Sequence, residues 1–184
     1  TTTCLNLGAS LKQMNKRVLL IDFDIQANLS LLLGYKDAKS FFDVIHSDAG
    51  DLAQYIVETE HAVCLLPSNS KMALLSKKHL ADENFEYMLR DKLRAVKQHF
   101  DYILIDTPPS GDFYTLNALL ASDIAVIPAQ CEYLSMNGVI HIKGMLDVIR
   151  EKTDHEIDYR VLVTMFDAQN TANKVILDKV NDQH

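Results

Sequence analysis

The sequence predicts an α/β fold: a doubly wound, mainly parallel sheet with helices on both faces. Three observations predict it. Short apolar runs lack the alternation of half-exposed strands, helical patterns separate these runs, and 184 residues suffice for one well-buried domain but are few for two. We therefore expect a single domain over residues 1–184.

The predicted strands are apolar throughout. A strand that is apolar on both faces belongs in the centre of a sheet that is covered on both sides, which is typical of parallel sheets. These runs lie at residues 17–22, 62–67, 102–106, 124–128 and 159–165.

Helical patterns separate the later strands. Apolar residues recur at spacings of three and four over residues 85–100 and again over 136–146, as on one side of an amphipathic helix. We expect these apolar residues in the core, and a last helix over residues 173–180. Strands that alternate with helices are typical of a doubly wound fold.

Composition excludes several classes of protein. No apolar run approaches the roughly 20 residues that a membrane-spanning helix needs, so we expect no integral membrane segment. The chain has 3 cysteines, far apart and without a CxxC pair, which argues against a disulfide framework or a structural zinc site and fits a reducing cytoplasm. The formal net charge of −7 argues against DNA binding through bulk charge.

Acidic residues end several of the predicted strands. Asp22 ends the first run, Asp24 follows it, Asp106 ends the third and Asp167 follows the last. Ligands of such sheets bind beyond the carboxyl ends of the strands, and clustered carboxylates attract a cation. Each aspartate taken alone is as often a helix cap or turn former. Asp106 also fits the Walker B pattern, in which a carboxylate holds magnesium.

Five segments, in the right order, carry a resemblance to ParA-type ATPases, the deviant Walker A branch of the ParA/MinD superfamily. The match covers nearly the whole chain. The segments are TTTCLNL at 1–7, DFDIQAN at 22–28, FDYILIDTPPS at 100–110 with LNAL at 116–119, IPAQCEY at 127–133, and VTMFD at 163–167.

The resemblance implies a nucleotide-binding domain with a P-loop NTPase-like fold and the cofactors ATP and Mg²⁺. The family's glycine-rich phosphate-binding loop would directly precede Thr1. The family also continues beyond the last predicted helix. We therefore expect residues 1–184 to be an internal fragment of a longer chain.

The resemblance also assigns roles near the phosphates. Thr1 is the candidate magnesium ligand, although a threonine there is also an ordinary helix cap. Thr2 would reach the phosphates, and Asp22 would support the magnesium without binding it directly. Asp24 would orient or activate the attacking water beside the metal, and Asp106 is the Walker B carboxylate.

A second group of residues would contact the rest of the nucleotide. Pro108 and Pro109 would stiffen the loop that senses the γ-phosphate, since two fixed φ angles limit its conformations. Thr164, Met165 and Asp167 lie where the family contacts the base, although a methionine after a strand is more often core.

By resemblance, the function is ATP-dependent DNA partition in plasmid or chromosome segregation. ATP would drive homodimerisation, and a ParB-like centromere-binding protein would stimulate magnesium-dependent hydrolysis. The dimer would bind non-specific DNA and localise to the cytoplasmic nucleoid. Gln169 stands where ParA proteins often place an arginine implicated in DNA binding, so we expect the DNA surface to lie outside these residues.

Two alternatives remain open. Ile25 stands where the ParA pattern has proline, as in the related MinD group, so a MinD-like ATPase that cycles on a membrane is one alternative. A non-hydrolysing regulatory scaffold on the same fold is the other, because a fold does not determine a function. The sequence before Thr1 would test the scaffold, and the sequence after His184 would separate membrane from DNA.

Overall fold

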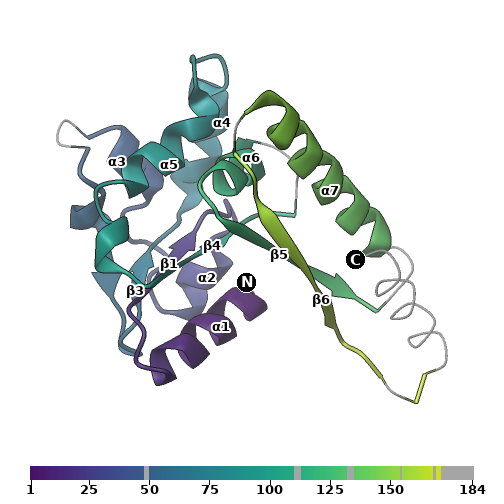
Figure 1. The fold of residues 1–184 in the computed structure, drawn as a ribbon. Coiled ribbons are helices and arrows are strands. Elements are labelled where there is room, and N and C mark those ends of the chain that lie inside the picture. The colour runs from purple at the N-terminus through teal and green to yellow at the C-terminus, as the bar shows by residue number, and fades with distance from the viewer. Residues whose placement is uncertain (48–49, 110–112, 132–134, 154, 168, 171–184) are drawn as a thin grey trace. The chain divides into compact units, whose positions relative to one another are not determined.

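The computed structural model describes residues 1–47, 50–109, 113–131, 135–153, 155–167 and 169–170. The chain divides into two compact units, Thr1–Ala121 and Ser122–His184, and each is described by itself (Figure 1). The single domain expected over residues 1–184 stays a prediction. The helix expected over residues 173–180 lies outside the described residues.

Helices and strands alternate along the chain. The α-helices are α1 (Thr2–Gln13), α2 (Asn28–Leu32), α3 (Phe41–Ile45), α4 (Ala73–His79), α5 (Met88–Leu93), α6 (Phe113–Leu120) and α7 (Ser135–Lys152). The strands are β1 (Val18–Asp22), β2 (Val57–Glu58), β3 (Cys64–Leu66), β4 (Tyr102–Asp106), β5 (Ile124–Gln130) and β6 (Asp158–Thr164). Short 3₁₀ helices lie at Leu52–Tyr55, Ser70–Met72, Phe85–Tyr87 and Lys97–His99.

The first unit contains a four-stranded sheet in the order β2-β3-β1-β4. β1 pairs in parallel with both β3 and β4, and all of its residues are buried, as the apolar run predicts. β2 pairs antiparallel with β3 at the edge. The sequence analysis did not predict this strand, because two residues are too few for a periodic pattern.

Helices cover both faces of this sheet, as predicted (Figure 1). On one face, Leu19 and Ile21 of β1 belong to a core that α3, α4, α5 and α6 complete. On the other face, Val18 and Leu20 pack against α1 and α2. The alternation of β1 side chains between the two cores is what two-sided burial of a strand requires.

Gly8 brings α1 close to the sheet. It is buried, and a Cβ at this position would lie 2.7 Å from Leu20 Cδ2. The absence of a side chain therefore lets the helix axis approach β1. This close approach sets where the N-terminus of α1 lies relative to the ends of the strands.

The second unit pairs β5 with β6 in parallel, and α7 packs on the pair through a core of Ile127, Ala129 and Val139. In the described part of this unit Ile124 and Val126 of β5 are 48 % and 43 % exposed, so burial of β5 on both faces stays a prediction. Within this unit α7 covers one face only, so the strand alternates.

The apolar pattern over residues 85–100 does not form one helix. Its residues are buried or packed on the core as predicted, but the backbone forms a 3₁₀ turn, α5 and a second 3₁₀ turn. Such turns are frequent at helix ends and keep a spacing of three, so an apolar pattern alone does not distinguish them from an α-helix.

Arg17 and Asp101 join the starts of β1 and β4. The guanidinium and the backbone amide of Arg17 both donate to the Asp101 carboxylate, at 2.8 Å each. The side-chain and backbone hydrogen bonds from Arg17 lower the pKa of Asp101 from 3.8 to about 2. A pKa that is lower in the folded than in the unfolded chain stabilises the fold above the unfolded value.

We predict that this contribution disappears in acid. Asp101→Asn should lower the urea midpoint at neutral pH, and the difference from wild type should narrow as the pH falls from about 4 toward 2, because the wild-type carboxylate is then protonated. Asp37→Asn is the matched control, since it removes an exposed carboxyl that forms no ion pair with the described residues. A difference between Asp101→Asn and wild type that is constant across this pH range would contradict the assignment.

Candidate functional site

The carboxyl ends of three parallel strands meet at one edge of the first sheet. The register pairs Asp22 of β1 with Asp106 of β4, and Ile21 of β1 with Leu66 of β3. Asp22 and Asp106 therefore lie side by side, and the loops after all three strands leave at the same edge. The structure thus brings together strand ends that are far apart in the sequence.

Asp22 is fully buried and is satisfied by donors from the following loop and helix. Its Oδ2 accepts hydrogen bonds from the Ser30 amide and the Ser30 hydroxyl, both at 2.7 Å, and its Oδ1 accepts one from the Asp24 amide at 3.3 Å. Burial raises the pKa of Asp22, the Ser30 hydrogen bonds oppose this shift, and the charge of Asp106 adds to it. Asp22 therefore holds the β1–α2 loop in place.

Asp24 lies in a tight turn of this loop and is 7 % exposed. Its carbonyl accepts from the Ser68 hydroxyl at 2.6 Å and from the Ala27 amide at 3.0 Å. Its Oδ1 accepts from the Gln26 amide at 2.9 Å. Among the described residues none donates a hydrogen bond to Oδ2. The backbone of Asp24 is thus anchored, while one of its carboxylate oxygens accepts no hydrogen bond from the described residues.

Asp106 lies directly beside the N-terminus of α1. Its Oδ1 is 2.7 Å from the Thr1 amino nitrogen. Its Oδ2 is buried and has no hydrogen-bond partner among the described residues. Thr1 occupies the N-cap position of α1, but its side chain makes no capping hydrogen bond. The ordinary capping role of Thr1 is therefore not realised, although its amino nitrogen contacts the Asp106 carboxylate.

This pair of residues fits a magnesium ion. Mg²⁺ usually binds proteins through one or two oxygen ligands and completes its shell with water and substrate phosphates. A buried carboxylate oxygen without a donor is the group such an ion would satisfy. Among the described residues no group of three or more His, Cys, Asp or Glu side chains could hold a metal ion. A cation held by Thr1 and Asp106 would complete its shell with water and bound anions.

Cys4 is not a nucleophile of this site. The thiol is on the first turn of α1, and burial, together with the charge of Asp106, raises its pKa to about 12. A thiol that stays protonated near neutral pH has little nucleophilic or metal-binding capacity.

The remaining predicted residues lie elsewhere. Thr2 is exposed on α1, and Pro108 is buried directly after β4. Thr164, Met165 and Asp167 belong to the second unit, at the end of β6. Met165 is 80 % exposed, which excludes the alternative that it is a core residue. The roles of all five residues stay predictions.

The sequence analysis missed Ser30 and Ser68. The Ser68 amide donates to the Ser30 hydroxyl at 2.8 Å, so the two serines connect the loop after β3 to Asp22 and Asp24. Ser68 follows a predicted strand at the same edge as the aspartates, and this position was a signal that could have found it. Ser30 lies inside a short helix and carries no such signal.

Comparisons with known proteins show the family of this chain. A family model described as an AAA domain matches residues 1–159. The sporulation initiation inhibitor protein Soj of Bacillus subtilis is 34 % identical, over 98 % of this chain and 73 % of its own length. The chromosome partitioning protein ParA of Myxococcus xanthus is 33 % identical, over 96 % of this chain and 64 % of its own length.

The chain belongs to the AAA domain family, within the ParA/MinD superfamily. Among solved structures, cobyrinic acid a,c-diamide synthase of Mycobacterium smegmatis superposes with a TM-score of 0.91 and 30 % identity, over 100 % of this chain and 76 % of that protein. It has been solved with ADP and magnesium and with an ATP analogue and magnesium. These findings confirm the predicted family and its P-loop NTPase-like fold.

In this ParA-type chain, we predict that the Ser30 hydroxyl stabilises the whole edge. Ser30→Ala should lower the free energy of unfolding by about 1–3 kcal/mol, because it leaves the buried Ser68 amide without its acceptor and removes one of the two donors to Asp22 Oδ2. Urea unfolding measures this loss. Ser10→Ala is the control, since its hydroxyl only donates to an exposed carbonyl on α1. Equal free energies of unfolding of the two variants would contradict a stabilising role of the Ser30 hydroxyl.

Proposed function

We propose that this protein is a magnesium-dependent ATPase for DNA partition. One observation carries the ATPase part of the proposal: Asp106, whose Oδ1 contacts Thr1 at the start of α1, has a buried Oδ2 without a partner among the described residues, at the edge where the anchored turn carries Asp24. The chain's similarity to proteins named Soj and ParA, and to a protein solved with ADP and magnesium, supports it.

The residues at this edge would have different roles in phosphoryl transfer: binding the phosphates, holding Mg²⁺ and orienting the attacking water. The N-terminus of α1 offers free N–H groups to an anion, and the phosphate-binding loop expected before Thr1 would complete this cradle. Thr1 and Asp106 would hold Mg²⁺, which neutralises charge on the phosphates. Asp24 would orient the attacking water with its Oδ2, which accepts no hydrogen bond from the described residues. Asp22 would keep the β1–α2 loop in place.

We favour partition over the diamide synthase activity after which the structural neighbour is named. Soj and ParA are 34 % and 33 % identical to this chain, and the synthase is 30 % identical. The motifs FDYILIDTPPS and DFDIQAN also match the ParA pattern. The same nucleotide site would serve either activity, so the partition proposal rests on the relatives rather than on the edge itself.

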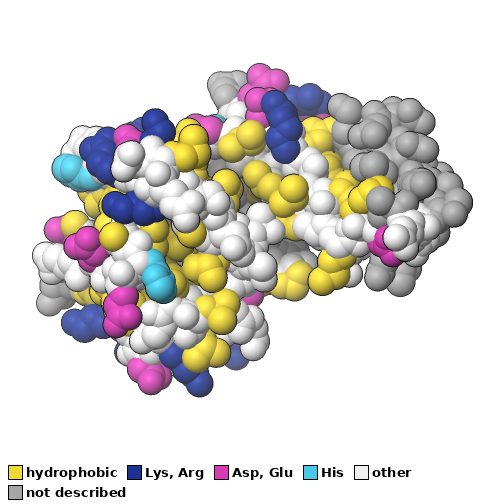
Figure 2. Space-filling model, turned by 90° about the horizontal axis from the view of Figure 1, so that it is seen from below, with side chains coloured by type: hydrophobic (Ala, Val, Ile, Leu, Met, Phe, Trp, Pro, Cys, Tyr) yellow, Lys and Arg dark blue, Asp and Glu magenta, His cyan; other side chains and the backbone are white. Residues whose placement is uncertain are grey.

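The switch we propose uses ATP to hold two copies together. A ParB-like partner would stimulate hydrolysis, and loss of the γ-phosphate would release the dimer. Non-specific DNA would bind outside the described residues. On the face drawn in Figure 2, Lys and Arg side chains lie scattered among acidic, histidine and apolar ones, and Gln169 is exposed. Neither observation favours a DNA surface here.

The membrane-cycling alternative has no support of its own in the structure. Ile25 is the sequence feature that favours it. No helix among the described residues is long and apolar enough to cross a bilayer. An amphipathic anchor is a separate possibility that this finding does not address.

We predict that Asp106 is needed for the metal rather than for the nucleotide alone. In the full protein that carries the phosphate-binding loop, Asp106→Asn should weaken MgATP binding by about tenfold or more and change magnesium-free ATP binding little. Titration calorimetry with and without Mg²⁺ measures both affinities. Asp37→Asn, which removes an exposed carboxyl that forms no ion pair with the described residues, is the control. Unchanged MgATP affinity in Asp106→Asn would overturn the site.

We predict a different defect for Asp24→Ala. Hydrolysis should slow far more than ATP binding weakens, because an interaction with the attacking water is made mainly on the way to the transition state. The variant should accumulate as an ATP-bound dimer, since a ligand that binds the dimer preferentially keeps it assembled until hydrolysis. Phosphate release and size-exclusion chromatography with MgATP measure the two effects.

The controls separate the alternatives. Asp37→Asn removes an exposed carboxyl away from the edge and should behave as wild type. An Asp24→Ala variant that binds ATP but stays monomeric would contradict nucleotide-driven dimerisation. A wild-type protein without turnover, even with DNA and its ParB-like partner, would favour the non-hydrolysing scaffold.

A further inference from the structure

Two histidines face each other on the opposite side of the sheet from α1 and α2. His46 follows the last residue of α3, and His79 is the last residue of α4. Their Nε2 atoms are 3.4 Å apart, and the ring centroids are 5.2 Å apart. Both helices pack on the core that α1 and α2 do not contact. The pair is therefore separate from the edge that carries Asp22, Asp24 and Asp106.

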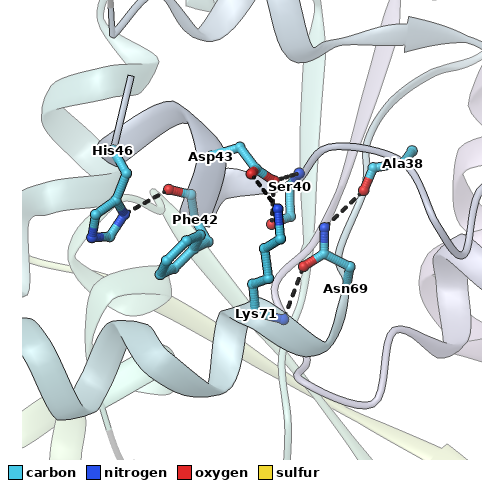
Figure 3. Close-up of polar contacts among 7 residues, drawn as sticks. All are labelled: Ala38, Ser40, Phe42, Asp43, His46, Asn69 and Lys71. Carbon is cyan, nitrogen blue, oxygen red and sulfur yellow. Dashed lines mark hydrogen bonds and ion pairs between the residues drawn. The ribbon is translucent and has the colours of Figure 1, made fainter. Parts of the chain in front are cut away.

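The other nitrogen of each ring faces an oxygen acceptor. His46 Nδ1 lies 2.8 Å from the Phe42 carbonyl oxygen, as Figure 3 shows, and His79 Nδ1 lies 2.7 Å from Asp82 Oδ2. A carbonyl and a carboxylate can only accept, so each Nδ1 is placed to donate. With Nδ1 donating, the two Nε2 atoms lie face to face, and a cation between them would satisfy both.

The spacing of the two Nε2 atoms matches that of two ligands of one metal ion. Zinc binds imidazole nitrogen at about 2.0–2.1 Å, so two such ligands on a tetrahedral ion lie about 3.4 Å apart. Metal-binding histidines characteristically donate their other N–H to a carboxylate or a backbone carbonyl, which is the arrangement found at both rings. We propose that His46 and His79 bind a divalent transition-metal ion such as Zn²⁺ through their Nε2 atoms.

The surroundings hold both rings in this position. The Phe42 ring stacks on His46 with centroids 4.0 Å apart. Asp43 Oδ2 accepts from the Ser40 amide at the start of α3, and Asp43 Oδ1 pairs with Lys71 Nζ at 3.0 Å (Figure 3). Lys71 lies in the 3₁₀ turn that leads directly into α4. One ion pair therefore links the segment that carries His46 to the segment that carries His79.

The site is accessible and incomplete. His46 is exposed, and the His79 side chain retains 20 % exposure. The described residues supply no third His, Cys, Asp or Glu ligand. Water or a donor from another molecule would fill the remaining positions. Imidazole ligands of this kind suit zinc, nickel and copper ions rather than magnesium, so the ion would not compete with Mg²⁺ at the other edge.

Calorimetric titration with zinc chloride tests the proposal on untagged protein freed of metal by a chelator. Wild type should bind one zinc ion saturably, and His46→Gln and His79→Gln should each weaken binding at least about tenfold. Asp82→Asn should weaken it by about tenfold while both ligands remain, because Asp82 only positions His79. His61→Gln, which removes an exposed histidine outside the pair, is the matched control and should bind zinc as wild type does.

Imidazole ¹⁵N spectra of the wild-type protein give a second test that needs no variant. Zinc should shift the Nε2 resonances of His46 and His79 and leave that of His61 unchanged. Saturable zinc binding that survives His46→Gln or His79→Gln, an equal loss in His61→Gln, or no saturable binding by wild type would each overturn the proposal. None of these outcomes depends on ATP hydrolysis, so they are independent of the proposed function.

Discussion

The buried carboxylate of Asp22 is the constraint on which the candidate site depends. An ionised carboxylate away from water is very unfavourable unless donors surround it. Its donors come from Ser30 on α2 and from the Asp24 amide, and the Ser30 hydroxyl is itself held by the Ser68 amide. Satisfying one charge therefore orders the loop between β1 and α2 and the residue that follows β3.

The same constraint connects the fold to a metal ion. Asp106 lies next to Asp22 in the register, and its charge contributes to the raised pKa of Asp22. Two carboxylates at one edge repel each other, and only one of them is surrounded by protein donors. A cation at Asp106 would offset this repulsion and stabilise the ionised form of Asp22. Binding at the edge and order in the Asp24 loop would then reinforce each other.

The sequence predicts which strand ends form the edge but not the hydrogen bonds that connect them. Apolar runs that end in aspartate, together with the rule that parallel strands end at one edge, are sufficient to predict Asp22 and Asp106 at the same edge, whereas the register that makes them neighbours comes from the structure. The donors to Asp22 and Asp24 could not be predicted, because serines such as Ser30 and Ser68 also occur in many turns and helices where they bond only to nearby backbone. The exposure of Ile124 and Val126 on β5 could not be predicted either. An apolar run shows that a strand can be buried, but it does not show which element covers it.

The loop after β3 reaches both candidate sites in four residues. Ser68 binds the Asp24 carbonyl, Asn69 donates to the Ala38 carbonyl, and Lys71 pairs with Asp43 beside the histidines. Contiguity alone does not couple two sites, because coupling requires an element with two arrangements that each ligand biases differently. The described contacts show one arrangement of this loop. The shared loop is therefore understood as a support that lets one short segment position two separate sites.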